Sequence, residues 1–173
     1  MKKKPAAVML LITCFLLAPV FASAVEEDLT AFPECPFCGM DRQKFAHSRM
    51  FIESEDDSEG FCSLHCAAIH LALQLDNAPK AIKVGDYNTH QLIDAEKAVW
   101  VIGGNKMGVM TKRAKWAFAK KEDADKFVKE NGGKLSTFDE AMKAAYEDMY
   151  TDTKMIRERR KARKMEPPAP PKK

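Results

Sequence analysis

The chain of 173 residues lacks a strong charge of one sign, a second long hydrophobic run and a familiar catalytic pattern. Without residues 1–24, whose removal is argued below, 25 basic residues face 25 acidic residues. Because proteins that bind nucleic acids carry surplus positive charge, we expect no nucleic-acid partner. No later run approaches the roughly 20 apolar residues that span a membrane. No general acid–base pair, phosphate loop or Ser-His-Asp pattern is visible, so we predict a protein that is not an enzyme.

The first residues have the pattern of a secretory signal peptide. A basic start at Lys2–Lys4 precedes an apolar stretch over residues 6–21, and Ala22-Ser23-Ala24 supplies the small residues that a signal peptidase reads. We expect cleavage after Ala24 and a mature protein in the periplasm or on the outer face of the cell envelope. An uncleaved membrane anchor is the alternative. Cys14 lies in the outline of a lipoprotein box, but the residues after it stay apolar, so we interpret it as part of the discarded segment.

The mature chain is expected to contain one domain and a tail. Residues 25–34 are predicted to be a linker and residues 35–150 a metal-binding domain with halves at about 35–80 and 81–150. The tail, residues 151–173, has nine basic residues against three acidic ones and ends in a proline-rich run. Because it shows no apolar face, we predict frayed helix passing into disorder. Such a tail could associate peripherally with a membrane.

Apolar periodicity predicts short strands alternating with helices. We expect Ala81–Val84 and Ala98–Ile102 to pair with each other. A strand–helix unit occurs twice, and this alternation of short strands and helices predicts an α+β fold. The remaining predicted elements are strands at 49–53, 61–62 and 115–119 and helices from Ser63 to about Asp76, from Lys121 to Asn131, and from the capping box at Thr137 to about Tyr150.

Four cysteines carry the predicted chemistry. Cys35 and Cys38 form a C-x-x-C pair on a glycine-ended turn, and Cys62 and Cys66 lie four residues apart at a predicted helix start. A helix N-terminus favours thiolate over thiol. Two such pairs can converge on one ion, and thiolates select soft metals such as Cu(I) or Zn(II) over calcium or magnesium.

Methionines distinguish between the soft metals, because thioether sulfur binds Cu(I) well and Zn(II) poorly. Met40 follows the first cysteine pair, and Met107 and Met110 flank Gly108. Each could instead fill the core. His65 or His70 could also bind the ion, with ordinary packing as the alternative, whereas His47 and His90 have no partner in the sequence.

Three other roles for the cysteines stay open. They could form structural disulfides in an oxidising compartment, hold a structural zinc ion, or provide a redox-active pair. Disulfides within each pair would close very small loops and stabilise little, although cross-pairing avoids that objection. Cys35 and Cys38 precede a strand rather than lying between a buried strand and a long helix, which argues against thioredoxin-like chemistry.

A series of short motifs follows one another along the chain: Cys35-Pro36-Phe37-Cys38-Gly39-Met40, Gly85-Asp86-Tyr87, Leu92–Ala98, Gly103-Gly104, Met107-Gly108, Phe118, Glu122-Asp123-Ala124 and Gly132-Gly133. In these motifs and their order the chain resembles the NosL family of nitrous-oxide-reductase accessory proteins. The resemblance implies two small ββαβ-like halves sharing a core and a periplasm-facing Cu(I)-binding protein without catalysis, and it extends that role to Cys35, Cys38, Met40 and Met107. Its partner would be a client copper enzyme, such as nitrous-oxide reductase, or the enzyme's assembly machinery.

Two features depart from that family. Its members are usually lipoproteins, whereas this chain begins with a simple cleavable signal. The segment Phe61–Cys66 instead resembles the TRASH or YHS metal-trafficking domains, in which an upstream cysteine joins a Cys-x-x-x-Cys pair. The prediction is therefore an exported Cu(I) chaperone or scaffold whose metal ligands are Cys35, Cys38, Met40, Cys62, Cys66 and Met107, with a zinc-stabilised interaction module or a thiol oxidoreductase as the alternatives.

Overall fold

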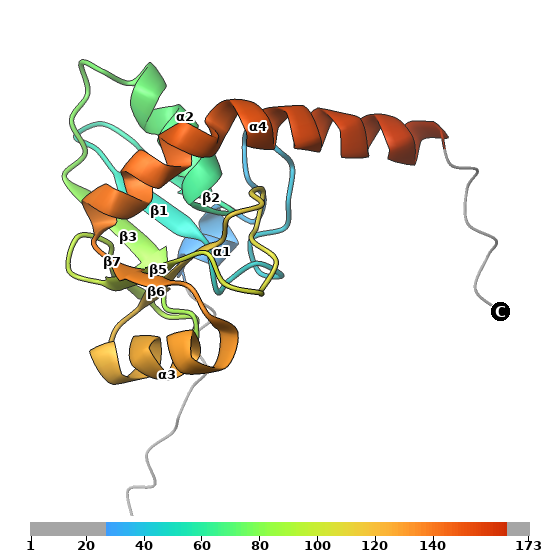
Figure 1. Ribbon diagram of the computed structural model, residues 1–173. Helices are drawn as coiled ribbons and strands as arrows, with labels where there is room; N and C mark the ends of the chain where they lie inside the picture. Colours follow the sequence, from blue (N-terminus) through green and yellow to red (C-terminus); the bar gives the residue numbers. More distant parts are fainter. Residues whose placement is uncertain (1–26, 166–173) are drawn as a thin grey trace, which may run out of the picture.

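Two strand–strand–helix–strand units follow each other along the chain, each built around its own antiparallel sheet (Figure 1). The computed structural model describes residues 27–165. The expected α+β fold with two ββαβ-like halves is confirmed. Its elements are α1 (Glu27–Ala31), β1 (Met50–Glu53), β2 (Ser58–Phe61), α2 (Leu64–Leu73), β3 (Ala81–Gly85), β4 (Leu92–Asp94), β5 (Val99–Ile102), β6 (Lys115–Phe118), α3 (Lys121–Asn131), β7 (Lys134–Ser136) and α4 (Phe138–Met165).

The two sheets have the same local order, with the first strand of each unit in the middle. In the first sheet the order is β2-β1-β3-β4, and in the second it is β6-β5-β7. Phe61 and Phe118 end the corresponding strands β2 and β6, and both side chains are completely buried. Burying one such ring stabilises a fold by about 2–3 kcal/mol. The two units therefore bury the same side chain at the same place.

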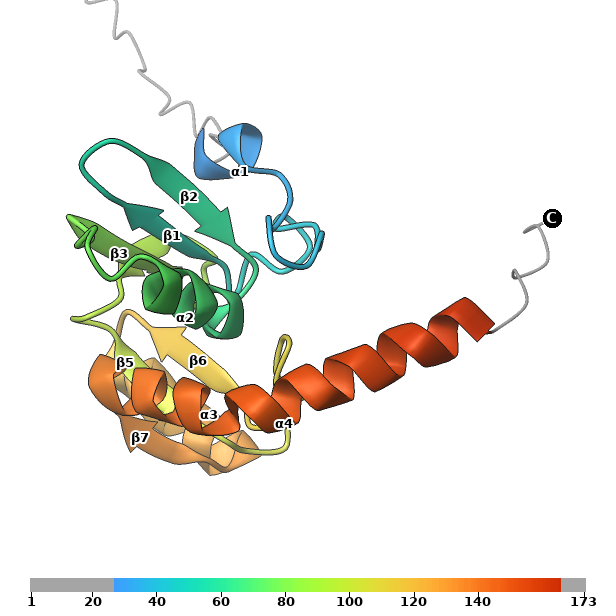
Figure 2. The same ribbon diagram turned by 90° about the horizontal axis from the view of Figure 1, so that it is seen from above.

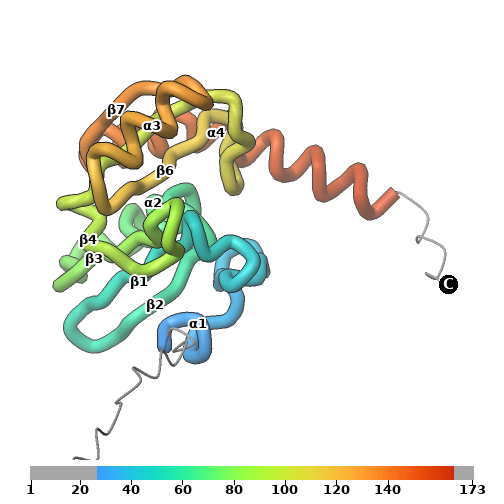
Figure 3. The backbone as a smooth tube through the Cα atoms, turned by 90° about the horizontal axis from the view of Figure 1, so that it is seen from below, coloured from blue at the N-terminus to red at the C-terminus, as the bar shows by residue number. Residues whose placement is uncertain are grey.

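The sheet partners differ from one expectation. We expected residues 81–84 and 98–102 to pair, but β3 pairs with β1 and β4, whereas β5 pairs with β6 and β7. The prediction was wrong because apolar content identifies strands without identifying their partners. The halves consequently meet between Asp94 and Val99, not near residue 80, and Figure 3 shows them as separate groups of strands.

A buried carboxylate joins the two halves just after β3. Asp86 Oδ1 accepts a hydrogen bond from the Ala119 amide of the second half at 2.8 Å. Its Oδ2 accepts from the Thr89 amide and hydroxyl, both at 2.8 Å. Burial alone would raise the pKa of Asp86, but these donors outweigh it and hold the pKa below its ordinary value. Asp86 is therefore a charged connection between the units.

The predicted linker contains a helix instead. In α1, Asp28 is buried and its carboxylate pairs with two buried guanidiniums, Arg42 at 2.6 Å and Arg49 at 3.0 Å. Arg42 also donates to the carbonyl oxygens of Phe32 and Met50. The expectation of a linker over residues 25–34 was wrong from Glu27 to Ala31, because the charge partners of Asp28 lie later in the sequence.

The last helix begins where expected and continues much further. The Thr137 amide donates to Glu140 Oε2 at 3.0 Å and the Glu140 amide to Thr137 Oγ1 at 3.3 Å, which confirms the capping box. However, α4 runs to Met165, beyond the expected end near Tyr150, and projects past both sheets (Figures 1 and 2). Residues 151–165, the first part of the predicted tail, are helical and continue α4. None of the described helices is both long and apolar enough to cross a membrane.

Burial explains the extension of α4 as far as Met155. Asp152 and Met155 are buried, and Asp152 Oδ1 accepts a hydrogen bond from the Lys112 amide at 3.0 Å. In contrast, α2 ends at Leu73 rather than near Asp76, and Leu75 is exposed. The predicted signal peptide, Cys14 and the proline-rich end lie outside the described residues.

Candidate metal centre

The first cysteine pair lies on a tight turn. The Cys35 amide donates to the Met40 carbonyl oxygen at 2.9 Å, and the Gly39 amide donates to the Cys35 carbonyl oxygen at 2.8 Å. Gly39 has a φ of 68°, which favours glycine because it has no Cβ. This closed turn places the thiols of Cys35 and Cys38 near each other.

The second pair lies where β2 passes into α2. Cys62 directly follows the last residue of β2, and Cys66 is in the first turn of α2. The Ser48 hydroxyl donates to the Cys62 carbonyl oxygen at 2.9 Å and so holds this junction. Phe37 from the first turn stacks on Phe61 with ring centroids 5.8 Å apart and an interplanar angle of 15°. This stacking brings the two cysteine pairs together.

The four thiols converge into one cluster. All four Sγ atoms lie within 4.8 Å of one another. Cys62 Sγ is 3.4 Å from Cys38 Sγ and 3.7 Å from Cys66 Sγ. All four cysteines are free, and these separations are far longer than a disulfide bond of about 2.05 Å. They are close to the roughly 3.8 Å edge of a tetrahedron with metal–sulfur bonds of about 2.3 Å, so the cluster is compatible with one tetrahedral ion.

The thiols of the cluster differ in their pKa. Hydrogen bonds from the thiols of Cys38, Cys62 and Cys66 lower the pKa of Cys35 far below its ordinary value. Hydrogen bonding to Cys35 raises the pKa of Cys62 and of Cys66. Within the cluster, hydrogen bonding therefore favours the thiolate form at Cys35 over that at Cys62 and Cys66. A bound cation would favour the thiolate form of every thiol that it contacts.

One side of the cluster is open. Cys35, Cys62 and Cys66 have exposed fractions of 1%, 0% and 1%, whereas Cys38 is half-buried. Cys38 borders a groove of about 760 Å³ that also contains Met40 and Met107 in its lining. An ion or a ligand would therefore reach the thiols past Cys38.

Methionine side chains line this groove. Met40 is half-buried, Met107 is 76% exposed, and both lie at the groove with Met110. Position 108 requires glycine, because a Cβ there would lie 2.7 Å from the Thr111 side chain and 2.9 Å from Ala114. Met110 has a φ of 60°, an uncommon value for a residue with a side chain. The loop is thus held in a specific shape.

The positions of the histidines differ from those expected from the sequence. His65 is buried with its Nδ1 atom 3.9 Å from Asp152, and His70 Nδ1 lies 3.1 Å from Glu59, so neither belongs to the thiol cluster. His47, expected to have no partner, lines the groove, and burial lowers its pKa. Met155 lines it too. Sequence reasoning missed Met155 because it lies far from the cysteines along the chain. It gave no role to His47, nine residues after Cys38, because no motif surrounds that residue.

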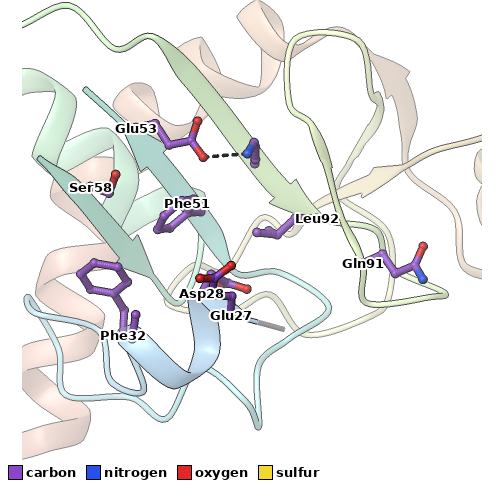
Figure 4. A pocket seen from close by; sticks show the side chains of 10 residues that line it. Glu27, Asp28, Phe32, Phe51, Glu53, Ser58, Gln91 and Leu92 are labelled. Carbon is purple, nitrogen blue, oxygen red and sulfur yellow. Dashed lines mark hydrogen bonds and ion pairs between the residues drawn. The ribbon is translucent and has the colours of Figure 1, made fainter. Parts of the chain in front are cut away.

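A second hollow lies beneath α1, on the opposite face of the first sheet from the buried Met50 and Ile52 (Figure 4). It has a volume of about 640 Å³ and is lined by Glu27, Phe51 and Lys83 among others. Lys83 pairs with Glu53 at 2.7 Å, and none of the four cysteines lines the hollow. The thiol cluster and its groove are therefore the better candidate site.

Two comparisons with known proteins find similar ones. The chain is similar to a solved structure, the copper chaperone NosL from Shewanella denitrificans, with 26% identity and a TM-score of 0.50. The match covers 62% of this chain and 87% of that chain. A comparison with curated proteins finds no match. The model of the NosL family matches residues 26–146, and the chain therefore belongs to the NosL family.

Proposed function

We propose that this protein is an exported, non-catalytic Cu(I) chaperone whose ligands come from the thiols of Cys35, Cys38, Cys62 and Cys66 and from the thioethers of Met40 and Met107 on the open side, with about four of these sulfur atoms on the ion at one time. The observation that carries the proposal is the cluster of four free thiols, of which only Cys38 borders a methionine-lined groove. A chaperone must release its ion, and an open side permits ligand exchange with another protein.

The donor chemistry supports copper as the cargo. Thiolate and thioether sulfur are soft donors that suit Cu(I), whereas Zn(II) gains little from methionine. The similar solved structure is that of a copper chaperone. We extend that role to this chain and propose that the ion passes to a client copper enzyme, such as nitrous-oxide reductase, or to its assembly machinery. We further propose cleavage after Ala24 and a location outside the cytoplasm.

Replacing single methionines tests the copper assignment. Met40→Leu and Met107→Leu nearly conserve side-chain volume and should cost little in packing. Each should weaken Cu(I) binding in an anaerobic titration against a competing chelator while leaving Zn(II) binding unchanged. Met142→Leu is the matched control, because Met142 is half-buried on α4 and does not line the groove.

A zinc-stabilised interaction module is the second candidate. Three buried cysteines and sulfur separations close to a tetrahedral edge are typical of a structural zinc site. This candidate predicts that neither methionine variant loses Cu(I) affinity and that a zinc chelator unfolds the protein. A thiol oxidoreductase is supported less well, because three of the four thiols are buried away from a reaction partner.

A further inference from the structure

The second half of α4 carries a basic stripe along the groove, formed by Arg159, Arg160, Arg163 and Lys164. Residues 155, 156, 159, 160, 163 and 164 follow the spacing of one helix face. The early members Met155 and Ile156 are apolar and pack at the groove. The later members are all cations and also line it: Arg159, Arg160, Arg163 and Lys164. This helix face thus changes from apolar to basic where α4 passes the open side of the cluster.

No charge of the opposite sign accompanies this stripe at the groove. The groove lining contains no aspartate or glutamate among the described residues. Residues 27–150 carry 16 basic and 21 acidic side chains, a net charge of −5, whereas residues 151–165 carry 7 and 2, a net charge of +5. The excess of positive charge among the described residues therefore lies on one projecting helix, next to the four thiols.

The helix is attached to the cysteine turn itself. Arg160 donates a hydrogen bond to the Cys38 carbonyl oxygen at 2.9 Å. This bond joins residues 122 positions apart and fixes the basic stripe beside the most exposed of the four thiols. A segment bound along the stripe would consequently lie against Cys38 and the methionines.

We propose that the basic stripe and the methionine-lined groove form a docking site for an acidic segment of a partner protein that exchanges copper with the cluster. Carboxylates of the segment would pair with Arg159, Arg163 and Lys164, and an apolar or methionine side chain would enter the groove. The basic stripe is complementary in charge to an acidic segment, which argues for this occupant. The groove borders Cys38, which argues that the bound segment exchanges copper with the cluster. The role in exchange rests on the proposed function, whereas the docking itself rests on the charge pattern alone.

The test uses the mature chain and a fluorescein-labelled, glutamate-rich peptide with one central methionine, followed by fluorescence anisotropy. We expect saturable binding that weakens as salt is added. Arg159→Glu combined with Arg163→Glu should weaken it by at least about tenfold. Arg157→Glu combined with Lys161→Glu is the matched control, since it makes the same charge change on residues of α4 that do not line the groove, and should weaken binding less than about threefold. Arg160 is retained in both variants because it holds the helix at Cys38.

Three outcomes would overturn the proposal. Equal losses of peptide affinity in the two double variants would show that the peptide binds by nonspecific electrostatic attraction. Displacement of the peptide by phosphatidylglycerol vesicles, but not by neutral vesicles, would assign the stripe to a lipid surface. Self-association that competes with the peptide and disappears in the Arg159/Arg163 variant would assign the groove to a second copy.

A parallel Cu(I) titration of the unaltered protein separates this inference from the proposed function. Copper binding without peptide binding would remove the docking site and leave the chaperone role. Peptide binding without copper binding would support the acidic docking site and remove its role in copper exchange.

Discussion

The two halves of the molecule share a topology and differ in chemistry at the same position. In the first half Phe61 ends β2 and is followed by Cys62, while in the second half Phe118 ends β6 and is followed by Ala119. The first junction contributes a thiol to the cluster. The second contributes a backbone amide to Asp86 and so connects the halves. The same scaffold position is therefore a ligand in one unit and a structural contact in the other.

The second half contributes to the site from different elements. Its β5–β6 loop carries Met107 and Met110, and the helix after it, α4, supplies Met155 and the basic stripe. The first half has only a short acidic turn between β1 and β2. The thiol cluster is therefore built on the first unit, and elements of the second unit border its open side.

The largest expected effect tests whether the two cores are equivalent. Phe61→Ala and Phe118→Ala should each lower the free energy of unfolding by about 3–5 kcal/mol, because each removes a completely buried ring. Urea unfolding of the metal-free, reduced protein measures both. If only one variant lost stability, the two rings would not contribute equally to the free energy of unfolding, contrary to what their equal burial indicates.

The next effect separates the chemistry of the junctions. Cys62→Ser should lower metal affinity by at least about a hundredfold, because Cys62 contacts two other thiols of the cluster and direct ligands outweigh supporting residues. Ala119→Ser, at the matching position, should leave affinity unchanged. A chelator competition assay compares them, and equal affinity in the two variants would remove Cys62 from the site.

The connection between the halves should be sensitive to pH. Asp86→Ala should destabilise the fold by about 1–3 kcal/mol, since it leaves buried donors without an acceptor. Because the folded-state pKa of Asp86 is lowered, its contribution is complete above the ordinary pKa of 3.8 and is lost as the pH falls through the lowered value. Urea unfolding across acidic pH measures this. Asp94→Ala, at an exposed turn within the first half, is the control and should change stability less.

The smallest effect compares two helix starts. Thr137→Ala should cost about 0.5–1 kcal/mol, because the capping box of α4 is formed. Ser63→Ala at the start of α2 should cost less, because the Ser63 side chain makes no capping hydrogen bond. Thermal unfolding of both variants gives the comparison. A larger loss at Ser63 would indicate that its contact with the Cys62 sulfur supports the junction.

Several features could be predicted from sequence because they depend on nearby residues. The bounds of α3 and the capping box at Thr137 follow from spacing within a few residues, and both agree with the structure. The convergence of the four cysteines was also expected, since two pairs separated by a hairpin can meet. The roles of Met40 and Met107 as ligands stay predictions, although both line the groove.

The amino-acid sequence by itself determined the two-unit α+β fold and which residues could bind a soft metal, because periodicity and donor chemistry belong to the residues themselves. Only the tertiary structure decided that β3 and β5 lie in different sheets, that α1 is held through Asp28, and that α4 continues to Met165. It also decided that His47 and a basic helix border the thiols. The physical reason is common to all of these features: strand partners, ion pairs and buried helix faces require contacts between residues far apart in the chain, and no local pattern specifies them.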